Sequence, residues 1–194
     1  MSKGRLEAFS DGVIAIIITI MVLELKVPHG DTWSALSPLA PVFISYVLSF
    51  VHVGIYWNNH HHLLQATKRV SGTILWSNAH LLFWLSLIPF VTAWMGENAF
   101  APNTVALYGI VLILCALSYS VLVRALLHEH RADSSLARAI GRDSKGNISL
   151  VLYALGIVVS FASGRLGLVF YAAVAVMWLV PDRRIEQVVG RGAD

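Results

Sequence analysis

Long apolar runs separated by short polar stretches are the main pattern of this chain. Six apolar segments can be delimited, at approximately residues 6–25, 38–64, 72–95, 103–127, 147–163 and 166–181. The longer ones reach the roughly 20 residues that a helix needs to cross the hydrocarbon core of a bilayer. None shows the period-two alternation of a membrane β-barrel, so helices are the way to satisfy the backbone in lipid. We predict an all-α integral membrane protein with six transmembrane helices in a single domain, residues 1–194.

Composition agrees with this interpretation. Hydrophobic residues make up 57% of the chain and charged residues only 13%, whereas soluble domains are about 25% charged. Little sequence remains outside the apolar segments to form a soluble catalytic domain. No serine–histidine–aspartate arrangement or phosphate-binding loop is recognisable, so we expect no enzyme activity and no cofactor. The single Cys115 excludes an intramolecular disulfide.

The positive charges predict how the chain is oriented. If the N-terminus is cytoplasmic, that side receives twelve of the basic residues: Lys3, Arg5, Lys68, Arg69, Arg124, Arg131, Arg138, Arg142, Lys145, Arg183, Arg184 and Arg191. The opposite side receives only Lys26 and Arg165. Cytoplasmic loops of membrane proteins carry this excess. We therefore expect an even number of spans with both termini in the cytoplasm, and no nucleic-acid partner.

Polar residues inside the first three segments gather on one side of the membrane in this topology. They are Arg5, Ser10 and Asp11 on the first, Trp57, Asn58, Asn59, His60 and His61 on the second, and Asn78 and His80 on the third. Polar groups at a common depth favour an interhelical hydrogen-bond cluster. Asp11 requires such partners, because an unpaired carboxylate in a span is costly.

The histidines suggest a metal site that helix geometry disfavours. Consecutive residues of a helix point about 100° apart, so His60, His61 and His62 cannot close on one ion from one helix. We predict structural hydrogen bonding for this run and no metal site, with a role in proton sensing or relay left open. His52, alone in the middle of its segment, is expected to be a buried and hydrogen-bonded histidine.

The first segment has one aliphatic face. At 100° per residue, Ile16, Ile20 and Leu23 form a stripe that also carries Gly12 and Thr19. Ser10 and Asp11 fall on the opposite side of the helix. An aliphatic stripe is typical of ordinary helix packing, and it is also what a hydrophobic pore constriction needs.

Several motifs resemble one known family. They are Arg5-x-x-x-Phe9-Ser10-Asp11-Gly12 followed by an isoleucine-rich helix with Thr19, Trp57-x-x-His60-His61, Pro89-Phe90-Val91-Thr92, and the closing Trp178-Leu179-Val180-Pro181-Asp182-Arg183-Arg184. Together they resemble the transmembrane protein 175 family of lysosomal potassium channels, specifically its shorter prokaryotic members. The resemblance covers nearly the whole chain.

The resemblance implies a fold and a set of site residues. Members of this kind have six helices per subunit, assemble as tetramers, and line a central pore with their first helices. Here the constriction would be Ile16, Ile20 and Leu23, with the hydroxyl of Thr19 beside it. The signature residues Arg5, Phe9, Ser10 and Asp11 would pack against Trp57, His60 and the third helix, in one network with His61, Asn78 and His80.

The implied function is a homotetrameric, potassium-permeable cation channel in the prokaryotic cell membrane. Its partners would be further copies of itself, lipids, K⁺ and other monovalent cations. An aliphatic collar dewets and blocks ions until it widens, and it should give only modest selectivity. Glu24 would attract cations at the outer mouth or pair with Lys26. The alternative is a proton channel or proton-coupled transporter that uses Asp11 and the intramembrane histidines.

Overall fold

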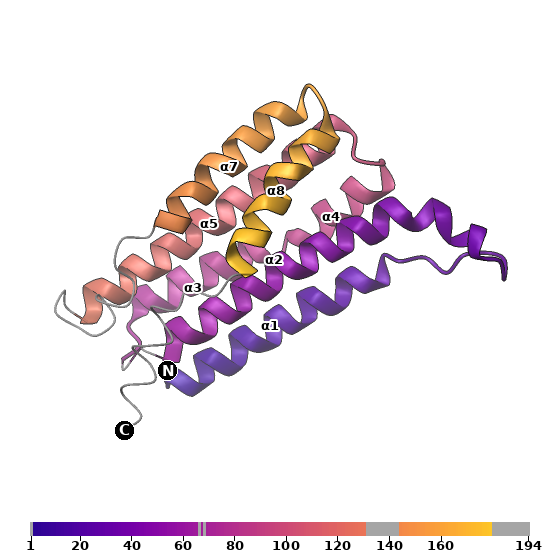
Figure 1. Cartoon of the computed structure of the whole chain (residues 1–194). Helices are drawn as coiled ribbons and strands as arrows, with labels where there is room; N and C mark the ends of the chain where they lie inside the picture. The colour runs from indigo at the N-terminus through magenta and orange to yellow at the C-terminus, as the bar shows by residue number, and fades with distance from the viewer. Residues whose placement is uncertain (1, 66, 68, 131–143, 180–194) are drawn as a thin grey trace.

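The computed structural model describes residues 2–65, 67, 69–130 and 144–179, and all of its regular structure is helical (Figure 1). The helices are α1 (Lys3–Leu23), η1 (Trp33–Leu39), α2 (Ala40–Gln65), α3 (Gly72–Leu85), α4 (Ile88–Glu97), α5 (Pro102–His130), α7 (Ser144–Ser160) and α8 (Gly164–Leu179). The prediction of an all-helical protein is thus confirmed. Most of the charged loop after α5 and the end of the closing motif, from Val180 on, lie outside the described residues.

The third predicted segment is two helices instead of one. Residues 86 and 87 form a turn between α3 and α4. Pro89 follows this turn in the first positions of α4. Proline has no backbone N–H, and its ring clashes with the carbonyl four residues earlier, here that of Leu85. The prediction of one continuous helix over 72–95 was therefore wrong at this point, although α4 continues the path of α3.

Among the described residues, four stretches are long and apolar enough to cross a membrane: Lys3–Leu23, Trp33–Gln65, Gly72–Glu97 and Pro102–Glu129. The two remaining apolar helices, α7 and α8, are shorter, at 17 and 16 residues. All of these helices run roughly alongside one another (Figure 1). The start of α1, the end of α2 and the start of α3 lie at one end of the bundle. At that end, Lys3 Nζ donates to the backbone oxygen of Gln65 at 2.8 Å.

Helix α1 lies at the margin of the bundle. It packs against α2, α3 and α4, whereas α7 and α8 pack against α5 and α2 on the other side (Figure 1). At the end of the bundle away from the N-terminus, Lys26 Nζ donates to Glu97 Oε1 at 2.7 Å. This hydrogen bond and the charge of Glu97 raise the pKa of Lys26. Lys26 thus pairs with Glu97, and Glu24 is left exposed.

Small residues allow the helices to approach closely, as is common in membrane bundles. Between α7 and α8, Gly156 and Gly167 leave room for the ring of Tyr171 and for the hydroxyl of Ser160. Between α2 and α4, Gly96 faces the backbone of Val42. A methyl group on Gly96 would stand 2.8 Å from the Cα of Val42, an atom that no rotamer change can move.

We expect Gly96→Ala to destabilise the protein by about 1–3 kcal/mol, because α2 and α4 must separate to relieve the overlap. Gly54→Ala is the matched control, since nothing lies within 4 Å of a methyl group at that position and alanine is the better helix former. Thermal unfolding of both variants in detergent micelles measures the difference. Equal unfolding temperatures for Gly96→Ala and the unsubstituted chain would contradict the packing described here.

Candidate functional site

Helix α1 separates two kinds of face. Its buried residues are Leu6, Ser10, Ile14, Ile17 and Met21. They follow one another at intervals of three and four, so they form one continuous stripe against the neighbouring helices. Between them, Glu7, Asp11, Val13 and Ile18 are half-buried, and the whole aliphatic stripe identified in the sequence is exposed. Helix α1 therefore packs through one face and leaves the other uncovered in the single chain.

A directed chain of hydrogen bonds joins α2, α3 and α1 at the buried face. The Nε2–H of His60 donates to Asn78 Oδ1 at 2.7 Å, and Asn78 Nδ2 donates to Ser10 Oγ at 3.0 Å. The hydroxyl of Ser10 in turn donates to the backbone oxygen of Leu6 at 2.8 Å. Since a carboxamide oxygen only accepts, the bond to Asn78 fixes the proton of His60 on Nε2. All three side chains are buried.

A second contact holds the next residue of α1. The indole Nε1–H of Trp57 donates to Asp11 Oδ1 at 3.1 Å. Trp57 and His60 lie one turn apart on α2. Ser10 and Asp11 are adjacent on α1, so the two contacts hold the same stretch of α1. The structure thus brings together Ser10, Asp11, Trp57, His60 and Asn78, residues that the sequence placed at a common depth.

Other predicted members lie elsewhere. Arg5 and Phe9 are on the exposed face of α1, where Phe9 is 57% exposed. His61 stacks on Trp57 and accepts from Gln65 within its own helix. His80 accepts from Trp84 one turn further along α3. Within the described residues, no group of three histidine, cysteine or acidic side chains is arranged to hold a metal ion.

The aliphatic stripe lies on the uncovered face of α1. The exposed fractions are 58% for Ile16, 43% for Ile20 and 78% for Leu23. Thr19 is exposed on the same face, and its hydroxyl donates to the backbone oxygen of Ile16 at 3.0 Å. Because the hydroxyl proton is used inside the helix, the lone pairs of the oxygen remain available to a cation.

The comparisons with known proteins decide the family. The model of the endosomal/lysosomal potassium channel TMEM175 matches residues 5–89. A potassium channel of Chryseobacterium sp. (strain P1-3) is 55% identical over 187 residues, which are 96% of this chain and 97% of the relative. This chain belongs to the TMEM175 family. Its fold also matches the crystal structure of a lysosomal potassium-selective channel TMEM175 homologue from Chamaesiphon minutus. The TM-score is 0.79 at 29% identity, over 92% of this chain and 96% of that one.

Animal TMEM175 proteins are longer and differently named. A protein of Bos taurus named endosomal/lysosomal proton channel TMEM175 is 30% identical over 182 residues. The match covers 84% of this chain and 38% of the animal protein. The match to the bacterial relative, by contrast, covers nearly the full length of both chains.

Two polar features of the interior were missed in the sequence. Ser49 joins α2 to α4 and α5 through hydrogen bonds to the hydroxyls of Thr92, at 2.7 Å, and Tyr108, at 3.0 Å. His52 was expected to be hydrogen-bonded, but within the part of the chain that the structure describes only its Nδ1 has a partner, and its Nε2 has none. For the Ser49 hydrogen bonds, the signal in the sequence was a hydroxyl residue near the middle of each of three segments. No sequence signal indicated the state of His52 Nε2.

Proposed function

We propose that this chain is a homotetrameric, potassium-permeable cation channel whose central pore is lined by α1. In this proposal the chain spans the prokaryotic cell membrane six times, with both termini in the cytoplasm. Four copies of Ile16, Ile20 and Leu23 form the constriction. The family membership and the name of the Chryseobacterium relative support permeation of K⁺. A pore on a rotation axis requires a closed cyclic assembly, and four copies fulfil that requirement.

The observation that carries the proposal is the division of α1 into a packed face and an uncovered face. The buried polar network fixes Ser10 and Asp11 to α2 and α3. This anchoring sets the rotation of α1 about its own axis. With that rotation, the aliphatic stripe and Thr19 all point away from the subunit. A helix held in this way can present one defined face to a symmetry axis.

The chemistry of the uncovered face suits a weakly selective cation pathway. The aliphatic rings offer no oxygen ligands, so they act as a barrier to hydrated ions until the pore widens. A ring of Thr19 oxygens between them supplies ligands for a partly dehydrated cation. Glu24, which the Lys26–Glu97 pair leaves exposed, adds negative charge just beyond Leu23. This charge favours cations over anions.

The second candidate function is a proton channel, and the name of the animal relative favours it. In that case protons would pass along Asp11 and the histidines instead of through the aliphatic collar. The hydrogen bonds of His60 and Asp11 point to another role for these groups, because both bind neighbouring helices and hold the bundle together.

Reversal potentials distinguish the two functions. The purified protein is reconstituted into a planar bilayer with KCl on one side and NaCl on the other, at equal pH. A channel of the proposed kind gives a reversal potential shifted toward the K⁺ equilibrium potential. The shift is smaller than that of a carbonyl-lined filter. A reversal potential that does not change with the K⁺ and Na⁺ gradients but changes with an imposed pH gradient would refute the proposal and support proton conduction.

A further inference from the structure

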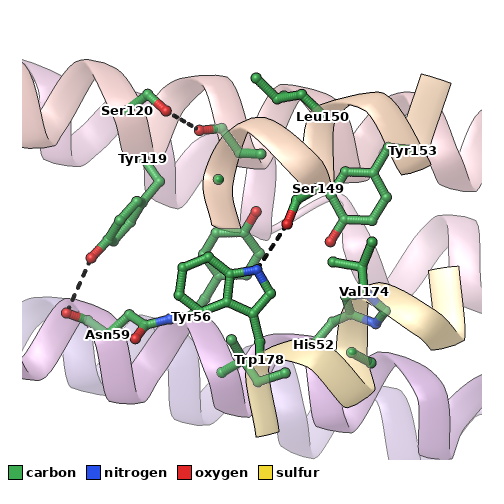
Figure 2. A pocket seen from close by; sticks show the side chains of 14 residues that line it. His52, Tyr56, Asn59, Tyr119, Ser120, Ser149, Leu150, Tyr153, Val174 and Trp178 are labelled. Carbon is green, nitrogen blue, oxygen red and sulfur yellow. Dashed lines mark hydrogen bonds between the residues drawn. The ribbon is translucent and has the colours of Figure 1, made fainter. Parts of the chain in front are cut away.

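A cavity lies between α2, α5, α7 and α8, away from α1 (Figure 2). Together with its open mouth it measures about 560 Å³, and its lining includes His52, Tyr56, Asn59, Ser149, Tyr153 and Trp178. His52, Ser149 and Tyr153 are buried, whereas Asn59 and Trp178 are half-exposed. The cavity therefore has a closed inner end and an open outer end, which is the form of a pocket that a small molecule can enter.

His52 determines what chemistry the inner end can accept. Its Nδ1 lies 2.9 Å from the backbone oxygen of Leu48. A carbonyl oxygen only accepts, so the ring proton is on Nδ1 and Nε2 is a bare acceptor. Nε2 is buried without a hydrogen-bond partner among residues 2–65, 67, 69–130 and 144–179, and the residue is only 2% exposed. A buried polar atom in this state is costly unless a donor from outside the protein reaches it.

The surrounding residues narrow the choice of donor. The hydroxyl of Tyr153 points into the cavity (Figure 2). Tyr56 adds a second phenol to the lining. Ile55, Val174 and Ala175 supply apolar wall. The inner end thus offers one acceptor, two hydroxyls that can donate, and a hydrocarbon lining. A hydroxyl group on an apolar body complements all of these.

We propose that this cavity binds a small uncharged amphiphile whose hydroxyl donates to His52 Nε2 and whose apolar body packs against Tyr153 and Val174. A membrane lipid with a free hydroxyl on its headgroup and a soluble alcohol or phenol share this chemistry. Binding at this site does not depend on the proposed channel function, because none of its groups belongs to α1.

The position of the cavity on α2 suggests what an occupant would do. His52, Tyr56 and Asn59 lie at intervals of four and three, so they share one face of α2. Trp57 and His60, which hold α1, lie about 100° around the same helix. An occupant therefore fixes α2 against α7 and α8 at the level where the neighbouring face of α2 anchors α1. An effect of the occupant on ion flow would follow from this contact, and it rests on the proposed function.

Competition between two closely matched compounds tests the binding site. The full chain in liposomes is labelled with a phenol carrying a photoactivatable diazirine, and the labelled peptides are located by mass spectrometry. We expect label on α7 and α8 residues of the cavity. Para-ethylphenol should suppress it, and para-ethylanisole should compete about tenfold more weakly, because it has the same body but no hydroxyl proton to donate. Equal competition by the two compounds would overturn the proposal.

Two substitutions locate the interaction. His52→Phe keeps an aromatic ring but removes the acceptor, so it should abolish the advantage of the phenol over the anisole. Ala175→Leu fills the cavity and should abolish labelling, whereas Ala173→Leu, on the exposed side of α8, should leave it unchanged. Thermal unfolding without ligand identifies any variant that fails to fold. Unchanged competition in folded His52→Phe would overturn the proposal, as would label spread evenly over lipid-exposed helices.

A third competitor distinguishes the two sources of the hydroxyl. Monoolein carries free hydroxyls on a membrane lipid, and its ethers, in which both hydroxyls are methylated, provide the matched control. Suppression by monoolein and not by its ethers supports a lipid occupant. Suppression by the phenol alone supports a soluble one. Failure of both to compete, as expected if the cavity holds only water, would overturn the proposal.

Discussion

Replacing Ile20 by asparagine should raise the resting K⁺ conductance of the reconstituted protein by about tenfold, equivalent to a barrier lowered by about 1.4 kcal/mol. The carboxamide keeps water in a ring that the isoleucine side chain dries, so ions cross with less dehydration. Ile16→Asn should act in the same direction. Both residues are on the uncovered face of α1, so the substitutions should not disturb the packing of the subunit. Single-channel and macroscopic currents in planar bilayers measure the effect.

Val158→Asn is the control for this prediction. Val158 is an aliphatic residue of α7 that is 68% exposed, and it lies on the other side of the bundle from α1. The control should leave conductance and the K⁺/Na⁺ reversal potential as in the unsubstituted chain. If Ile16→Asn and Ile20→Asn conduct no differently from Val158→Asn, the stripe is a lipid or packing surface and the constriction lies elsewhere.

Replacing Asn78 by leucine should destabilise the folded protein by about 1–2 kcal/mol. The change leaves the Nε2–H of buried His60 without an acceptor and takes the donor from Ser10. A lost partner of a buried group costs about 1–3 kcal/mol in water-soluble proteins, and somewhat less in membranes. Denaturant unfolding in mixed micelles measures the loss. The hydrogen-bond network also sets the rotation of α1 about its own axis. Loss of the network should therefore lower the K⁺ current per protein.

Asn58→Leu is the matched control, because Asn58 is an exposed asparagine at the end of α2 that carries His60. A double-mutant cycle with Ser10→Ala separates the network from general effects of the substitution. The two changes should be less than additive, since each removes the same bond. Strict additivity, or equal destabilisation by Asn58→Leu, would show that the hydrogen-bond chain contributes nothing measurable.

The sequence predicted the helices well because hydrophobic length dominates the structure of a chain in lipid. It failed at Ser86 and Leu87, where Pro89 interrupts the backbone ladder and divides one apolar segment into α3 and α4. Hydropathy cannot detect such a break. The signal for this break in the sequence is Pro89, four residues after Leu85, because its ring clashes with the carbonyl of Leu85.

The depth of a polar residue in the membrane was easier to predict from the sequence than the side chain that it contacts. The positions of Ser10, Asp11, Trp57, His60 and Asn78 along their segments placed them at one level, and the structure joins them there. Arg5 and His80 share that level but point elsewhere, because depth does not specify which way a side chain faces. The environment of His52 Nε2 is formed by four helices that are distant in sequence. No local sequence pattern specifies how those helices pack.

The most direct test of the central claim is whether a thiol placed on the uncovered face of α1 lies in the path of the ions. Ag⁺ is close to K⁺ in size, and it binds thiolates tightly. Current through Thr19→Cys should be blocked by Ag⁺, while the unsubstituted chain, whose single Cys115 is buried, and Val176→Cys on the exposed side of α8 should keep conducting. A Thr19→Cys protein that conducts K⁺ normally and is untouched by Ag⁺ would contradict the account.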